Sequence, residues 1–201
     1  MPELPDHNKQ IFFNVMSKRM SIEVFEQWVY TDQELEQTLS ADSYLELISL
    51  NFKKSGVRYE LFNLLQKFVG AGEYETWKLT RLLNSVKAHE INLPGLLEQL
   101  YYLYCDGYTF LSALGLGFGL SMCVLPKPYK VEHWSNLSAG ELAQVVRNLP
   151  LLIINYEADL VLRWLADGSI VLTGEKNEIN QYDYIDNRSD AEKARIPQYG
   201  F

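Results

Sequence analysis

The stretch Val57-Arg58-Tyr59-Glu60-Leu61-Phe62-Asn63-Leu64-Leu65-Gln66-Lys67-Phe68 decides the fold class. Its apolar residues recur at the spacing i, i+4, i+7, i+8 and i+11: Val57, Leu61, Leu64, Leu65 and Phe68. This spacing places them on one face of a helix, whereas a strand would alternate with a period of two. The stretch therefore predicts an amphipathic helix that ends at Gly70 and Gly72.

Three shorter helices are predicted before it, between Ser21 and Phe52, because apolar residues again recur every three or four positions. Their apolar positions are Ile22, Phe25 and Val29 in the first, Leu35 and Leu39 in the second, and Leu45 and Ile48 in the third. Thr31 and Glu34 have the spacing of a capping box for the second helix. Asp42 or Ser43 is the expected N-cap of the third.

Four helices are predicted after it. The first is expected over about 74–86, with Trp77 and Leu83 buried, and the second begins at Pro94 and carries Leu97, Leu100, Tyr101 and Tyr104. The third runs from a Ser138–Glu141 capping box to about Leu149. The fourth begins at Pro150, and its apolar face consists of Leu151, Ile154, Ala158, Val161, Leu162 and Leu165. Asp159 and Arg163 are predicted to form an i, i+4 ion pair on the last of these.

The C-terminal part changes character after Gly168. Residues 169–173 are branched and short enough for a strand, and 182–185 are the expected partner strand. The fold class is thus predicted to be mainly α, a compact multi-helix domain with a small C-terminal β-hairpin near residues 169–186. Residues 1–10 are expected to be a flexible N-terminus, and 11–201 a single helical domain.

The uncharged segment Gly107–Leu125 is long enough for a membrane span. We expect no span, because glycines at 115, 117 and 119 weaken a helix and Pro126 and Pro128 close the segment in a connection. The glycines at 115–119 do not match G-x-G-x-x-G, so close packing or a turn is expected in place of nucleotide binding.

Composition restricts the function classes. The chain has 18 Lys and Arg against 26 Asp and Glu, a net charge of -8 that repels phosphate backbones and anionic membranes. We therefore expect neither nucleic acid nor a membrane as partner. The N-terminus lacks a secretory pattern, and Cys105 and Cys123 lie in apolar stretches where cysteine is usually buried, so a cytoplasmic location is expected.

Residues that could support catalysis are few. His7, His89 and His133 lack a second histidine or cysteine at metal-ligand spacing. Near the C-terminus, acids could hold a cation, but the basic residues among them favour a solvated ion-pair network: Glu178, Asp183, Asp186 and Asp190 against Arg188, Lys193 and Arg195. We expect no enzyme activity, no catalytic residue, no metal and no cofactor.

The distinctive feature is the charge of the segment between Ser21 and Phe52, which has acidic residues but no lysine or arginine. Such a field favours encounter with a basic partner, and aromatic side chains often anchor interfaces. The alternative is that the acids cover wet helix faces while the aromatics pack in the core. The predicted partner-binding residues are Glu23, Glu26, Trp28, Tyr30, Asp32, Glu34, Glu36, Asp42, Tyr44 and Glu46.

The runs Phe25-Glu26-Gln27-Trp28-Val29-Tyr30, Leu35-Glu36-Gln37-Thr38-Leu39 and Tyr44-Leu45-Glu46-Leu47-Ile48-Ser49-Leu50-Asn51-Phe52 resemble a segment of bacterial immunity-type proteins of polymorphic or contact-dependent toxin systems. The resemblance covers about residues 20–70, with a weaker similarity from Trp164 to Arg188. It implies a cytoplasmic, acidic protein that neutralises a cognate toxin by binding it, and it assigns no toxin-binding residue.

These observations predict a binding protein that covers a basic surface on a protein partner, a toxin domain in the leading hypothesis. The alternative is a helical scaffold or regulatory subunit that forms a homodimer through the aromatic-rich segment 101–118.

Overall fold

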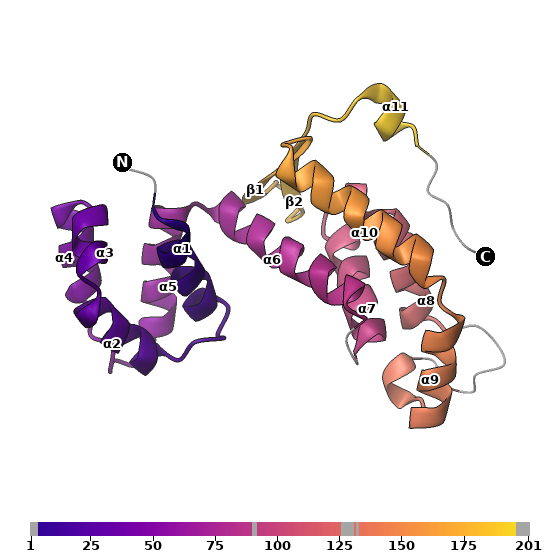
Figure 1. Ribbon diagram of the computed structural model, residues 1–201, viewed down its shortest axis with the longest axis horizontal. Helices are drawn as coiled ribbons and strands as arrows, with labels where there is room; N and C mark the ends of the chain where they lie inside the picture. Colours follow the sequence, from indigo (N-terminus) through magenta and orange to yellow (C-terminus); the bar gives the residue numbers. More distant parts are fainter. Residues whose placement is uncertain (1–3, 90–91, 126–130, 132, 196–201) are drawn as a thin grey trace. The chain divides into compact units, whose positions relative to one another are not determined.

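The computed structural model describes residues 4–89, 92–125, 131 and 133–195. The chain divides into two compact units, Met1–Tyr74 and Glu75–Phe201, whereas the sequence predicts a single domain over 11–201. The mainly α class with a C-terminal hairpin is confirmed (Figure 1). The connection expected at Pro126 and Pro128, and residues 1–3 of the expected flexible N-terminus, lie outside the described residues.

The first unit contains five helices and the start of a sixth: α1 (Asp6–Met16), α2 (Ile22–Thr31), α3 (Gln33–Thr38), α4 (Ala41–Ile48), α5 (Val57–Val69) and α6 (Ala71–Lys87). Helix α1 begins at Asp6, so residues 6–10 are helical although the sequence predicts that they fray. The physical reason is that Lys9 forms a 2.8 Å ion pair with Glu73 and that the flanking Leu4 and Ile11 are buried. Gly70 ends α5 with a positive φ of 78°, but Gly72 lies inside α6.

Two predicted helix caps are wrong. Asp32 caps α3 in place of Thr31, because its Oδ1 accepts hydrogen bonds from the N–H groups of Glu34 and Leu35, each at 2.9 Å. Ser40 caps α4 in place of Asp42 or Ser43, and its Oγ accepts from the Ser43 N–H. In both cases a residue nearer the helix start supplies the acceptor.

The core of this unit is an aromatic cluster. The rings of Phe12, Phe25 and Trp28 lie 5.6 to 6.1 Å apart, a usual distance for interacting aromatic rings. Phe12 and Phe25 are completely buried, and the predicted inward positions of α5 are buried beside them except for the half-buried Phe68. The clearest helical pattern of the sequence therefore builds the core that fixes α2.

The described part of the second unit contains, after α6, the following helices and strands: α7 (Leu93–Cys105), the 3-10 helix η1 (Thr109–Leu111), the π-helix η2 (Ala113–Gly119), α8 (Leu120–Cys123), the 3-10 helix η3 (Trp134–Asn136), α9 (Ala139–Asn148), α10 (Leu151–Ala166), β1 (Ile170–Lys176), β2 (Tyr182–Asp186) and α11 (Asp190–Lys193). The predicted Ser138–Glu141 capping box is present at α9. The predicted inward face of α10 is confirmed in part, because Ile154, Ala158 and Val161 are buried, whereas Leu151, Leu162 and Leu165 are half-buried.

The glycine-rich segment is helical, whereas the sequence predicts that its glycines weaken a helix. A Cβ on Gly115 would meet the Leu100 carbonyl oxygen at 2.7 Å, and one on Gly119 would collide with the Leu97 carbonyl. Helix η2 thus packs directly on the backbone of α7, which only glycine allows. The Gly117 N–H donates to the Ser112 carbonyl at 3.0 Å, the i to i−5 pattern of a π-helix.

The hairpin covers Tyr108. Strands β1 and β2 pair antiparallel, with Val171 opposite Ile185 and an irregularity after Leu172. The ring of Tyr182 stacks on the buried Tyr108 at 4.9 Å. Burial also raises the pKa of the Tyr108 phenol. The strands are therefore held to each other by pairing and to the helices by aromatic packing.

No helix in the described part of the chain combines the length and the apolar character that a membrane crossing requires.

Candidate functional site

The acidic side chains predicted to bind a partner all lie on α2, α3 and α4 or between them, in the first unit. We call this set the acidic surface: Glu23, Glu26, Asp32, Glu34, Glu36, Asp42 and Glu46. Glu26 and Asp32 are half-buried, whereas the other five are exposed. The structure therefore places most of the predicted charges in water, where they can act on a partner.

Three of these acids already have a role within the unit. Asp32 caps α3, and Glu23 lies in the first turn of α2, where hydrogen bonds from its own N–H and from Ser21 hold its pKa below the usual value. Glu46 forms a 3.0 Å ion pair with Lys67 of α5, so the segment is not wholly unpaired in space although it lacks cations in sequence. Exposed pairs of this kind contribute only about 0–1 kcal/mol.

Glu34, Glu36 and Asp42 are the acids of this surface with the least structural explanation. All three are exposed, and their carboxylates form no hydrogen bond or ion pair with the described residues. They lie in the first turns of α3 and α4, where the helix dipole favours negative charge. They are the strongest candidates for contact with a cationic surface.

The predicted aromatic anchors differ from one another. Trp28 is half-buried in the core cluster, 5.9 Å from the ring of Phe12, and so serves the fold. Tyr44 is half-buried. Tyr30 is 57% exposed, while its hydroxyl donates to the Ile48 carbonyl at 3.3 Å. Tyr30 alone therefore offers a largely open ring on the acidic surface.

Two exposed apolar residues of the same helices escape the sequence prediction. Val24 is 52% exposed on α2, and Leu45 is 56% exposed on α4 although its spacing predicts an inward position. Leu47 is buried in its place. Asp42, Leu45 and Glu46 are spaced i, i+3 and i+4 and share one outer face of α4, a signal that the sequence does contain.

A second polar cluster surrounds Glu98 of α7. Its carboxylate accepts hydrogen bonds from His133 Nε2 at 2.7 Å, Trp134 Nε1 at 2.9 Å and the Tyr102 hydroxyl at 3.1 Å. Burial raises the pKa of Glu98, but these hydrogen bonds outweigh it and keep the pKa below its usual range. The cluster ties the segment before α9 to α7.

The Glu98 cluster also contains a hydroxyl, an imidazole and a carboxylate in line. The Ser135 hydroxyl lies 2.7 Å from His133 Nδ1, and Nε2 reaches Glu98, an order that nucleophilic catalysis uses. The Ser135 N–H donates to the same Nδ1 at 3.3 Å, so His133 is the N-cap of η3. We therefore interpret the array as the cap of η3.

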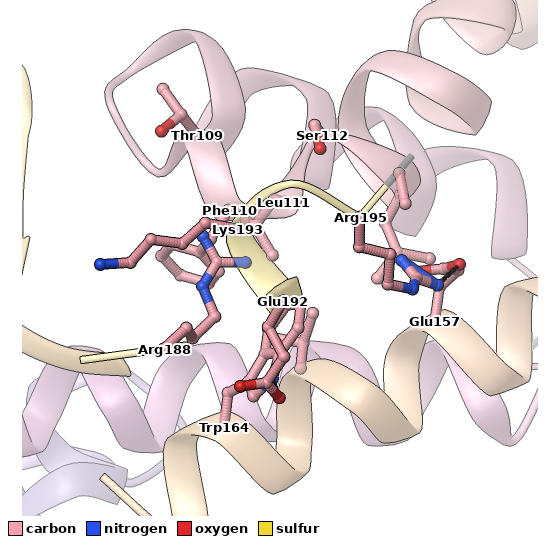
Figure 2. A pocket seen from close by; sticks show the side chains of 13 residues that line it. Thr109, Phe110, Leu111, Ser112, Glu157, Trp164, Arg188, Glu192, Lys193 and Arg195 are labelled. Atoms are coloured by element: carbon pink, nitrogen blue, oxygen red, sulfur yellow. Dashed lines mark hydrogen bonds and ion pairs between the residues drawn. The ribbon is translucent and has the colours of Figure 1, made fainter. Parts of the chain in front are cut away.

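A pocket of about 210 Å³ lies in the second unit between α10, η1 and the C-terminal segment (Figure 2). Its polar lining includes Glu157, which is 2% exposed, and Arg195, whose guanidinium binds both carboxylate oxygens of Glu157. Burial raises the pKa of Glu157, and Arg195 opposes this rise. Trp164 Nε1 donates to Glu192 at 3.0 Å, and both of these residues also line the pocket.

The ion pairs near this pocket correct two predictions. Asp159 pairs with Lys87 at 2.5 Å, and Arg163 lies 3.7 Å from Glu192, so the predicted Asp159–Arg163 pair is wrong. The predicted C-terminal network is present only in part. Arg188 binds Asp186 at 2.8 Å, but Arg195 reaches back to α10. Sequence spacing could not find the Arg195–Glu157 pair, because 38 positions separate the two residues.

Both cysteines differ from the expectation of buried thiols. Cys105 is exposed and Cys123 is half-buried beside Glu98. No group of three histidine, cysteine or acidic side chains in the described ranges 4–89, 92–125, 131 and 133–195 is arranged to hold a metal ion. Comparison with family models, with curated proteins and with solved structures finds no match.

Proposed function

We propose that the chain is a binding protein whose acidic surface covers a basic surface on a protein partner. The observation that carries the proposal is the set of exposed acids on α3 and α4, Glu34, Glu36 and Asp42, on a segment without lysine or arginine. Carboxylates in this arrangement accelerate encounter with cationic surfaces and disfavour acidic ones.

Exposed apolar groups add contact area to this charge. Val24, Tyr30 and Leu45 are each more than half exposed on the same helices. Interfaces gain most of their affinity from a few apolar or aromatic groups surrounded by polar ones, while charge sets partner choice. The partner is therefore expected to present lysine or arginine around an apolar patch.

The partner class that we propose is a toxin domain, which makes the chain an immunity-type protein. This step depends on the resemblance of residues 20–70 to immunity-type proteins. A basic surface is what a nucleic-acid-cleaving toxin would need for its own substrate, and an acidic partner would compete with that substrate.

The homodimer alternative gains less support. Its predicted interface, residues 101–118, supplies the core of the second unit, because Phe110, Leu111, Leu114 and Phe118 are at most 5% exposed. Tyr102 and Leu116 are the exposed apolar residues of that segment. No observation favours this alternative over the acidic surface.

Co-expression with each candidate toxin domain encoded in the flanking genes tests the proposal. Wild-type protein should restore growth, and the double variant Glu36→Lys/Asp42→Lys should lose at least about tenfold of this protection, because reversed charges repel a basic surface. The matched control is Glu175→Lys/Glu178→Lys, which changes the net charge equally at two exposed residues of the second unit. Absence of protection by wild-type protein, or equal loss in both variants, would contradict the proposal.

A further inference from the structure

Glu157 is a charged group in an unusual position. It lies in the middle of α10 and is 2% exposed, between the buried residues Ala158 and Val161 and the pocket. An ionised carboxylate this deep requires a cation and hydrogen-bond donors, since its burial otherwise favours protonation. Within the described chain, its cation is Arg195, which comes from outside α11.

The contact with Arg195 has the features of guanidinium recognition. Nη1 donates to Oε2 at 3.0 Å and Nη2 donates to Oε1, so two parallel hydrogen bonds join the planar groups. The guanidinium also lies over the ring of Tyr156, 5.6 Å from its centroid. A lysine ammonium could neutralise the charge but could not make this planar fork.

The segment that delivers Arg195 is held to the unit by side chains. We call residues 188–195 the strap. The Arg188 N–H donates to Asp186 Oδ1 at 3.1 Å, and the other described backbone hydrogen bonds of the strap stay within it, such as Lys193 N–H to the Ser189 carbonyl at 3.0 Å. Its contacts with α10 come from the Glu192 and Arg195 side chains and from the Arg188 guanidinium over the Trp164 ring at 4.4 Å.

The strap also covers space. The pocket of about 210 Å³ lies beneath it, and Figure 2 shows Arg195 directed at Glu157 along one wall while Lys193 extends at another. A close-packed segment would leave no such volume. If the strap moved away from α10, its side-chain contacts with that helix would be lost. The Glu157 carboxylate, which is already oriented to bind a guanidinium, would then be exposed.

We propose that Glu157 and Tyr156 form a binding site for the guanidinium group of an arginine side chain, and that Arg195 is its internal occupant. An external arginine takes the site when the strap lifts. The site lies in the second unit and does not depend on the acidic surface, so it goes beyond the proposed function.

Chemical rescue of the full chain tests this site. In the variant Arg195→Ala, methylguanidinium should raise the melting temperature at concentrations that leave the wild type unchanged, because it refills the vacated site. Methylammonium, which has the charge without the fork, should raise it less. The same rise in Arg195→Ala/Glu157→Gln, or no rise in Arg195→Ala, would overturn the proposal.

A second variant keeps the test decisive if Arg195→Ala does not fold. Arg195→Lys retains a cation beside Glu157 and weakens only the internal competitor. N-acetyl-argininamide, followed by calorimetry, should bind this variant at least about tenfold more tightly than the wild type, since the site is less often occupied internally. Equal affinity for both proteins would exclude a competing internal arginine.

Discussion

At the scale of single residues, the Glu157–Arg195 pair is the interaction with the largest expected energetic consequence. Glu157 is 2% exposed, so removing Arg195 leaves a buried charge without compensation. Such a loss typically costs about 3–5 kcal/mol, whereas exposed pairs contribute about 0–1 kcal/mol. Because Glu157 is buried, the larger of these two energies applies to its pair with Arg195.

Arg195→Ala is therefore expected to lower the free energy of unfolding by about 3 kcal/mol near neutral pH. Burial raises the pKa of Glu157 above 4.5, and loss of Arg195 raises it further. A raised carboxyl pKa stabilises the folded state at low pH, and this stability is lost as pH rises through the folded pKa. The loss of unfolding free energy caused by Arg195→Ala should therefore be small near pH 4.5. It should reach its full size at pH values well above the pKa of Glu157 in the folded variant.

Urea unfolding of wild type and variant at about pH 5 and about pH 8 measures this difference. The other charged groups that line the pocket, Arg188, Glu192 and Lys193, remain in both proteins. Arg163→Ala is the control, because Arg163 is exposed and its ion pair with Glu192 is long, at 3.7 Å. This substitution should lower the free energy of unfolding by about 0–1 kcal/mol. A penalty for Arg195→Ala that is equal at both pH values would contradict the account of Glu157.

At the scale of elements, the contact between η2 and α7 organises the second unit. Gly115 and Gly119 are spaced i, i+4 and both face the α7 backbone at distances that exclude a Cβ. Gly140 of α9 is a useful contrast, because a Cβ there would meet nothing within 4 Å. The two kinds of glycine predict opposite effects of the same substitution.

Gly119→Ala should destabilise the protein by about 1–3 kcal/mol, since the new methyl group meets a backbone carbonyl that cannot rotate away. Gly140→Ala should stabilise it by about 0.5–1 kcal/mol through helix propensity. Denaturant unfolding monitored by circular dichroism compares the two. A neutral or stabilising Gly119→Ala would show that η2 does not pack on α7 as described.

The elements also show what the sequence could predict. Periodicity identified the helical class, the inward face of α5 and half of the predicted inward positions of α10, because long apolar stripes are determined locally. The Ser138–Glu141 capping box of α9 could be predicted because it too depends only on residues close in sequence. The caps Asp32 and Ser40 were missed because several neighbouring residues could serve as caps and only the chain path selects one.

The remaining differences depend on contacts between distant residues. For the glycines at 115–119 the sequence left close packing and a turn open, and only the contact with α7 decides for close packing within a helix. Leu45 is exposed because Leu47 takes the inward position on a short helix. Within the candidate site, the exposure of Glu34, Glu36 and Asp42 was predictable. The sequence left open whether Trp28 anchors an interface or packs in the core, and the fold places its half-buried ring in the aromatic cluster.

At the scale of the whole molecule, charge and structure divide between two compact units. The first unit has an acidic surface on three short helices, and the second has a pocket around a buried ion pair. The net charge of -8 is shared equally, because Met1–Tyr74 has 7 Lys and Arg against 11 Asp and Glu, and Glu75–Phe201 has 11 against 15, which leaves -4 in each unit. What distinguishes the first unit is the local density of charge, with seven acids and no lysine or arginine between Ser21 and Phe52.

Binding through the acidic surface is tested by measuring, as a function of salt, the affinity for candidate toxin domains encoded in the flanking genes. Wild-type affinity should fall steadily as salt shortens the screening length below about 10 Å, while Glu36→Lys/Asp42→Lys should bind at least about tenfold more weakly at low salt and vary less with salt. Glu175→Lys/Glu178→Lys should follow the wild type, and circular dichroism should show unchanged helicity in all three. An affinity that is flat across salt and equal for the three proteins would contradict binding through the acidic surface.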